Sequence, residues 1–315
     1  MIRYLLSRAL QSLLVLVLVS IVVFLLIHLL PGSPARAELG IKATPAAIAI
    51  FNRINGYDHP LYYQYWIYVK HLLEGNLGFS YVQNSPVSTL IWSRLPKSAL
   101  LIGISLLVTI LASIPMGLYQ AMRRNRLPDY VLTAANFTLY AFPTFWLAFL
   151  LIDGFALQLH IFPPAAPDSN SLASILAQWK GLVLPVLTLS LGSIAGYSRF
   201  MRSAAVESMV QDYVRTARMK GVSERRIMFG HVLRNSMIPM ATLIGMSLPA
   251  LLGGALITEE IFNYPGLGMM FFQAASQQDY SVLLALTLLG AVGVVIGNFV
   301  SDLLYALLDP RIRLT

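Results

Sequence analysis

The chain contains no cysteine, and this absence excludes several kinds of chemistry. Without thiols there is no disulfide framework, no thiolate metal site and no cysteine nucleophile. The five histidines are dispersed, with no pair at the spacing of metal ligands on a helix, so we interpret them as structural or interfacial side chains. No acid pair or catalytic triad stands out. The sequence therefore predicts neither a metal site nor catalytic residues.

A phosphate-binding loop is missing as well. The GxxxxGK[ST] pattern requires a Gly-Lys dipeptide, and none occurs in the 315 residues. If ATP drives this protein, another polypeptide must bind the nucleotide and its Mg²⁺. We therefore expect no cofactor in this chain.

Charged residues are scarce. They make up 11% of the chain, against 57% hydrophobic residues and a mean hydropathy of +0.68, whereas soluble domains contain about 25% charged residues. These proportions indicate an integral membrane protein. The net charge of +8 does not indicate nucleic-acid binding, because the basic residues gather at the ends of apolar runs, as in the cytoplasmic loops of membrane proteins.

Six apolar runs are long enough to cross a membrane as helices, which takes about 20 residues. They cover residues 9–30, 97–121, 130–157, 181–200, 236–258 and 281–308. The expected fold class is therefore an all-α membrane protein with six transmembrane helices.

Lys and Arg are concentrated on one side of these spans. Fifteen of the 22 lie in the N-terminal segment, the 122–129 and 199–235 loops and the C-terminal tail, and such loops stay in the cytoplasm. Both termini are therefore expected there. Ala35-Arg36-Ala37 imitates a signal-peptidase site, but the preceding apolar run exceeds the roughly 7–15 residues of a signal sequence, which favours a retained first span.

Residues 31–96 form the largest segment on the opposite, outer side. Its stretch Leu61-Tyr-Tyr-Gln-Tyr-Trp-Ile-Tyr68 is dense in aromatic side chains, which favour the membrane–water interface. We expect one or two short helices lying on the outer leaflet. A role for these rings in stacking on substrate is the alternative.

Residues 205–239 form a polar, basic interruption between two spans. Ala205, Met209, Tyr213 and Ala217 recur at every fourth position, which predicts one apolar stripe of a helix. Gly221 stands where a helix C-cap is expected, and Ser223 can cap a second helix from Glu224. The pattern predicts helix, glycine turn and helix.

This segment resembles the EAA loop of binding-protein-dependent ABC importers, whose pattern is E-A-A-x3-G-x9-I-x-L-P. The matching positions hold Arg215, Thr216, Ala217, Gly221, His231, Leu233 and Arg234. Only Ala217, Gly221 and Leu233 keep the general pattern. The departures are those usual in the peptide branch of the family.

The resemblance extends over nearly the whole chain. The further matches are Leu30-Pro-Gly-Ser-Pro34 (with Ser33 where Asp is expected), Pro60-Leu61, residues 63–65, 75–80, 86–87, 94–96 and 114–117, Glu259, Phe262, and residues 265–268, 279–280 and 303–311. In order and spacing the chain is similar to the B-type permease subunits of dipeptide and oligopeptide importers.

The resemblance implies a type I ABC importer permease fold with cytoplasmic coupling helices. It divides the chain into an N-terminal helix and extracytoplasmic segment (1–93), a transmembrane core (94–308) and a cytoplasmic tail (309–315). It further implies a second homologous permease, two ATP-binding subunits, an extracytoplasmic solute-binding protein and a peptide substrate. Related permeases import nickel, metal chelates, haem or glutathione, and these substrates remain alternatives.

A short amphipathic helix in the 205–239 segment is expected to dock on an ATPase. The residues expected to couple the two are Tyr213, Val214, Arg215, Ala217, Met219, Gly221, Glu224, Arg225 and Arg226. Among these, Tyr213, Val214 and Met219 are expected to supply apolar contacts. The alternative is a basic helix resting on anionic lipid.

Polar residues in the spans are candidates for the substrate pathway. Asp153 either lines this pathway or sits at the interface, where an acid costs less than at mid-bilayer. Asn235, Thr242, Ser247 and Thr258 give the fifth span a polar stripe. This stripe faces the pathway or serves hydrogen bonding between helices.

The loop after the fifth span is expected to form a short outer helix near the mouth of the pathway. By analogy with the family, its candidates for binding-protein docking are Glu259, Glu260, Pro265, Gly266 and Gly268. Two rival classes stay open: an ion-coupled secondary carrier, for which Asp153 would be the intramembrane acid, and a membrane scaffold or receptor that uses the basic loop as a partner dock.

Overall fold

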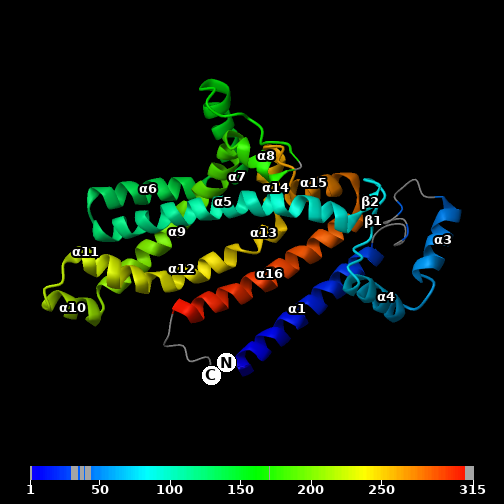
Figure 1. Cartoon of the computed structure of the whole chain (residues 1–315), viewed down its shortest axis with the longest axis horizontal. Coiled ribbons are helices and arrows are strands. Elements are labelled where there is room, and N and C mark those ends of the chain that lie inside the picture. The colour runs from blue at the N-terminus through cyan, green and yellow to red at the C-terminus, as the bar shows by residue number, and fades with distance from the viewer. Residues whose placement is uncertain (1, 30–34, 36–38, 40–43, 170, 309–315) are drawn as a thin grey trace.

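The structure is a computed structural model that describes residues 2–29, 35, 39, 44–169 and 171–308. The sequence motif at residues 30–34 and the C-terminal tail lie outside these ranges. The long helices are α1 (Ile2–Leu29), α5 (Val87–Met122), α6 (Leu127–Ala141), α9 (Lys180–Met209), α12 (Leu233–Ser247) and α16 (Tyr280–Leu308). They run roughly along one direction (Figure 1).

Several shorter elements lie at the two ends of these helices (Figure 1). At one end lie α3 (Pro45–Asn55), α4 (Leu61–Leu73), a two-stranded hairpin of β1 (Phe79–Ser80) and β2 (Ser85–Pro86), and α15 (Leu267–Gln277). At the other end lie α10 (Asp212–Met219) and α11 (Glu224–Ile227). One or two short helices were expected in the 31–96 segment, and α3 and α4 lie there.

Among the described residues, four helices are long and apolar enough to cross a membrane. They cover Val87–Met122, Lys180–Met209, Glu224–Gly253 and Tyr280–Ser301, and a bent pair of helices passes the same test together. Helix α1 adds a shorter apolar stretch at Leu10–Leu26. The membrane character expected from composition is thus matched by the helices, while the count of six spans stays a prediction.

The expected span at 130–157 is not one continuous helix, and its crossing of the membrane stays a prediction. Helix α6 and the pair α7 (Thr144–Leu151) with the π-helix η1 (Ile152–Gln158) meet at 104°. Phe142 has an extended backbone with ψ of 128°. The following Pro143 explains this, because proline disfavours the α conformation in the residue before it.

The fifth expected span, 236–258, is displaced toward the N-terminus. Its helical path covers Glu224–Gly253 and includes the π-helix η2 (Met228–Val232) and α13 (Ala250–Gly253). It ends at Gly254, whose φ of +76° is left-handed and where a Cβ would lie 2.4 Å from the nitrogen of Gly268. Thr258 therefore lies on the separate helix α14 (Leu256–Ile261), so the predicted four-residue polar stripe is wrong at this position.

Helix crossings depend on small residues. Helix α9 packs along α5, and a Cβ on Gly117 would lie 2.5 Å from the carbonyl oxygen of Ser198. Where α12 crosses α16, a Cβ on Gly245 would lie 2.3 Å from that of Ser301. Small residues let helix backbones approach closely, which drives packing where lipid removes the hydrophobic advantage of association.

Replacing Gly117 with leucine is expected to destabilise the chain by about 1–3 kcal/mol or more, because overpacking forces the two helices apart. Gly192→Ala on α9 is the control, since nothing lies within 4 Å of its Cβ position. Thermal unfolding of the purified chains in mild detergent measures both. Equal transition temperatures for Gly117→Leu and the wild type would contradict the packing argument.

Candidate functional site

The 205–239 segment forms two short helices joined by a glycine turn, as predicted. The apolar stripe, however, does not lie on one helix, because α9 ends at Met209 and Gln211 has an extended backbone before α10 begins. The apolar residues of the two helices pack against each other instead. Ala205, Val214 and Ala217 are buried together in one core cluster.

The turn after α10 is a Schellman motif. The N–H of Gly221 donates to the carbonyl of Arg218 at 3.0 Å, and that of Val222 donates to Ala217 at 3.1 Å, which is the pairing that closes such helix ends. Gly221 has φ of +74°, and nothing lies within 4 Å of its Cβ position. Handedness, not space, therefore favours glycine here.

The second helix begins without the expected side-chain cap. Ser223 has the extended N-cap backbone but makes no capping hydrogen bond with its hydroxyl. An ion pair spans the turn instead, with Arg218 Nε and Nη2 at 2.7 and 3.2 Å from the carboxylate of Glu224. Both side chains are exposed, so this pair contributes at most about 1 kcal/mol.

The side chains expected to couple this segment to an ATPase divide into two sets. Val214 and Ala217 are buried in the core of the chain, so Val214 does not offer the apolar surface predicted for it. Tyr213, Arg215, Met219, Gly221, Glu224, Arg225 and Arg226 are exposed. A shallow cavity of about 430 Å³ lies among Ser223, Arg225, Arg226 and Phe229. The exposed surface is cationic with apolar side chains at its edges.

In the 254–279 segment, Glu259 of α14 is a fully buried carboxylate. Its Oε1 accepts from the Ser98 hydroxyl at 2.7 Å and from the N–H of Ala255 at 3.0 Å. Its Oε2 accepts from the N–H groups of Gly268 at 2.7 Å and Met269 at 3.2 Å. A buried charge is costly unless it is hydrogen-bonded in this way.

These contacts cap the N-terminus of α15 from a distance. The first helical N–H, that of Leu267, donates to the Ser98 hydroxyl at 2.7 Å, and the next two donate to Glu259. The N-cap residue is Gly266, where a Cβ would lie 2.3 Å from Glu259 Oε2. The carboxylate thus occupies the place of a local cap and stabilises the positive end of the helix dipole.

A second carboxylate of this segment caps α16. Asp279 is buried, accepts from the N–H of Val282 at 3.4 Å, and binds the hydroxyl of Ser80 on β1. Next to the first site, the Tyr264 hydroxyl donates to the carbonyl of Lys97 at 2.8 Å. Burial, and then the charge of Glu259, raise the pKa of Tyr264 above its ordinary value. The 254–279 segment is therefore fastened to α5 and to the hairpin.

Most of the residues predicted to dock the binding protein in this segment are buried. Glu259, Gly266 and Gly268 are buried, while Pro265 and Glu260 are partly exposed. Tight backbone packing explains the glycines, since a Cβ on Gly268 would lie 2.5 Å from the nitrogen of Leu256. The exposed large apolar side chains on α14 and α15 are Ile257 and Phe272. Sequence patterns could not separate the buried from the exposed residues of such a short loop.

The predicted pathway residues do not form one cluster. Asp153 is exposed on η1 and accepts a hydrogen bond of 2.7 Å from Gln158. Asn235 is exposed and bonds the carbonyl of His231 at 3.1 Å. Thr242 and Ser247 are partly buried on α12, and Thr258 is buried on α14. Ser247 hydrogen-bonds the Tyr197 hydroxyl of α9, the kind of interhelical bond that was the alternative.

Sequence reasoning missed an ion pair between α6 and α9. Asp129 is buried, and its two oxygens lie 2.6 and 2.7 Å from Nε and Nη2 of Arg202. The N–H of Asn125 donates to the same carboxylate at 3.0 Å. The signal available was that Asp129 is the single acid following three arginines in the 122–129 loop.

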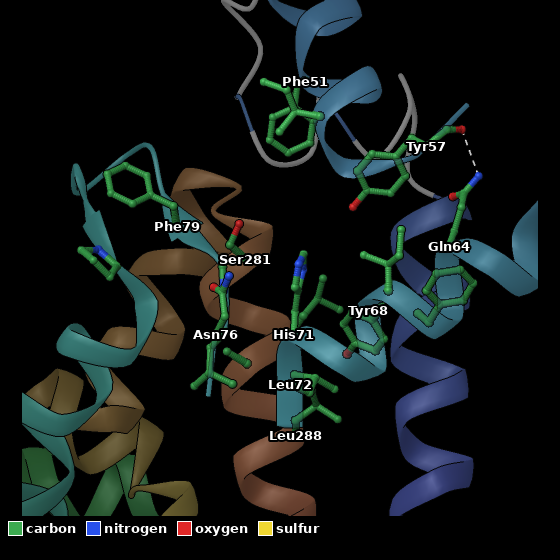
Figure 2. A pocket seen from close by; sticks show the side chains of 18 of the residues that line it. Phe51, Tyr57, Gln64, Tyr68, His71, Leu72, Asn76, Phe79, Ser281 and Leu288 are labelled. Atoms are coloured by element: carbon green, nitrogen blue, oxygen red, sulfur yellow. Dashed lines mark hydrogen bonds between the residues drawn. The ribbon is translucent and has the colours of Figure 1, made fainter. Parts of the chain in front are cut away.

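The aromatic helix α4 packs against α1 with one face. Tyr65 binds the Ser20 hydroxyl at 2.9 Å, and Gln64 binds His28 at 2.8 Å. Tyr62 and Trp66 on its other face are exposed. Between α1, α3, α4, the hairpin and α16 lies a cavity of about 520 Å³ (Figure 2).

Comparison with known proteins shows which family the chain belongs to. Residues 113–314 match the family described as binding-protein-dependent transport system inner membrane component, and residues 1–102 match its N-terminal family. The chain belongs to this family of permeases. It is a membrane component of a binding-protein-dependent ABC transporter. The permease subunits of this family lack an ATPase site of their own and work with binding-protein and ATPase partners.

Relatives align with the permease from end to end. It is 37% identical over 315 residues to the oligopeptide transport system permease protein AppB of Bacillus subtilis, covering 99% of this chain and 100% of the relative. It is 39% identical over 313 residues to the glutathione transport system permease protein GsiC of Salmonella choleraesuis, covering 99% of both chains. GsiC of Escherichia coli K12 is 37% identical over the same coverage.

Removing the Glu259 carboxylate is expected to destabilise the permease strongly. In Glu259→Ala, the N–H groups of Ala255, Gly268 and Met269, which are buried or partly buried, lose their acceptor, and an unsatisfied buried donor costs about 1–3 kcal/mol. Glu207→Ala on the exposed surface of α9 is the control. Unfolding temperature and the yield of monodisperse protein measure both, and a Glu259→Ala variant as stable as Glu207→Ala would contradict the buried-cap assignment.

Proposed function

We propose that this chain is a permease subunit of an ATP-driven importer of di- or oligopeptides. The observation that supports the substrate class is its alignment, over 99% of its length, with permeases named for oligopeptide and glutathione transport. Glutathione itself is the second candidate, because GsiC is as similar to the chain as AppB is. An ion-coupled carrier or a membrane scaffold is not supported by these relatives.

In the proposed assembly, the chain crosses the cell membrane six times in the type I importer fold, with both termini in the cytoplasm. It pairs with a second homologous permease and two ATP-binding subunits, identical or different, which supply ATP and Mg²⁺ binding. A solute-binding protein delivers the peptide on the side of α3, α4 and α15. Substrate then enters a cavity between the two permeases.

The 205–239 segment would transmit the movement of the ATPases. The helix pair α10–α11 is joined to the core through Val214, Ala217 and Ile227, while Met219, Arg225 and Arg226 remain exposed for a partner. A force on the exposed face would therefore act on α9 and α12 as rigid bodies, which is how such transporters alternate access. The buried residues anchor the helix pair to the core, and the exposed residues contact the ATPase.

Gly221 provides the first test of this coupling role. Gly221→Ala places a Cβ at φ of +74°, which costs about 1 kcal/mol and alters the exit angle of α10. Gly221→Trp should uncouple ATP hydrolysis from uptake while the subunits still assemble. Gly230→Ala is the matched control, because its Cβ position is equally open and its φ lies outside the left-handed range. Wild-type uptake by Gly221→Trp would refute the role.

Purification of the tagged chain from native membranes in mild detergent tests the assembly. A second permease and ATPases with Walker motifs are expected to co-purify, as identified by mass spectrometry. The associated binding protein can then be screened for peptide and glutathione binding. Recovery of the chain alone, still able to transport in liposomes without ATP, would favour a secondary carrier.

A further inference from the structure

The cavity beside α4 is a second site, separate from the fastened 254–279 segment and from the 205–239 segment. It has a volume of about 520 Å³, within the range of about 300–1,000 Å³ typical of ligand pockets. In Figure 2, Phe51 and Tyr57 lie on one side of it, Leu72 and Leu288 on the other, and His71 between them. Its walls come from five separate parts of the chain.

The chemistry of the walls favours an uncharged, apolar guest. The apolar side chains that line the cavity include Phe24, Ile67, Leu72, Leu284 and Leu288. No Asp, Glu, Lys or Arg occurs among the described residues of the lining. A free peptide carries an ammonium and a carboxylate, whose burial without a partner is costly. The cavity is therefore poorly suited to the proposed substrate.

The polar side chains of the lining differ in whether their hydrogen-bonding groups already have partners within the protein. Gln64 donates to the carbonyls of Tyr57 and His59 and binds His28, so its groups are occupied. The imidazole of His71 and the amide NH₂ of Asn76 have no hydrogen-bond partner among the described residues, and both are at least partly accessible. The cavity thus combines apolar walls with polar groups, His71 and Asn76 among them, that are available for hydrogen bonding.

The cavity lies next to helices that are expected to contact lipid. Ser281 and Leu288 both line the cavity and lie seven residues apart on α16, so the cavity extends about 10 Å along a helix apolar enough to cross a membrane. Phe24 lies on α1, whose Leu18, Leu25 and Leu26 are exposed as for contact with lipid. Apolar cavities are unfavourable for water and bind apolar molecules. The nearest source of such molecules is the bilayer itself.

We propose that this cavity binds one acyl chain of a phospholipid from the leaflet on the side of α4. The chain packs among Phe24, Leu72 and Leu288, and the His71 and Asn76 side chains hydrogen-bond the ester or phosphate oxygens. The bound lipid fills the space between α1, α4 and α16 and joins the interfacial helix to the spans. This inference rests on the membrane location of the family and not on peptide import.

Photolabelling of the reconstituted chain tests the proposal. The vesicles contain phosphatidylethanolamine and phosphatidylglycerol, with a trace of phospholipid carrying a diazirine near the end of one acyl chain. After irradiation, mass spectrometry is expected to locate label on the α4 and α16 residues that line the cavity. Leu288→Trp fills the cavity and should lower this label at least fivefold, while label on exposed residues of α5 stays constant.

The controls separate a specific site from general lipid contact. Leu111→Trp, on an exposed position of α5, should leave cavity labelling unchanged. Should Leu288→Trp fail to fold, Leu72→Trp fills the same space from α4. His71→Ala with Asn76→Ala should reduce the phospholipid retained through purification by at least twofold. Unchanged cavity labelling in a folded filling variant, or wild-type labelling no stronger there than on α5, would overturn the proposal. No substrate is used, so failure of peptide import would not affect the result.

Discussion

Polar groups within a membrane protein must find partners in the protein, because hydrocarbon offers none, and this constraint shapes the chain at both ends. Glu259, Asp279 and Asp129 are all buried acids. Each accepts a hydrogen bond from a distant element: Glu259 from Ser98, Asp279 from Ser80, and Asp129 from Arg202. These three acids therefore connect segments that are far apart along the chain.

The three acids share a second property. Each lies at the N-terminus of a helix, either on the helix itself or against it: Asp129 in the first turn of α6, Asp279 before α16, and Glu259 beside α15. Negative charge is favourable there because the backbone N–H groups of the first turn are unpaired. At α15 and α16 a carboxylate thus accepts from helix N–H groups and joins elements at once, whereas the backbone partner of Asp129 is Asn125, just before α6.

Sequence alone predicted the features that depend on local pattern. The apolar runs indicated the spans, and Gly221 with its flanking helices was predicted because a glycine after a basic helix end is a local signal. The bend at Phe142 was readable from Pro143 but was outweighed by the continuous apolar run. The break at Gly254 depends instead on the approach of Gly268, and no pattern in the sequence reveals a contact of that kind.

Burial within short segments was harder still. Val214 and Tyr213 are neighbours in α10, yet one is in the core and the other is exposed; the break at Gln211 shifts the helix face and makes an uninterrupted stripe misleading. Glu259 looked like a surface acid, because an acid in a polar loop usually is. Its burial follows from Ser98, which is 161 residues away in the sequence, and from the missing side chain of Gly266.

The open surroundings of Gly221 have a consequence for chirality. At most of the tight glycines in this fold, such as Gly245 and Gly266, any β-carbon meets a neighbouring atom. At Gly221 the surroundings are empty and only the sign of φ is restrictive. A D-amino acid favours positive φ as an L-amino acid favours negative φ, by mirror symmetry. The turn therefore selects a configuration rather than a size, and glycine is the achiral residue that ribosomal synthesis can place there.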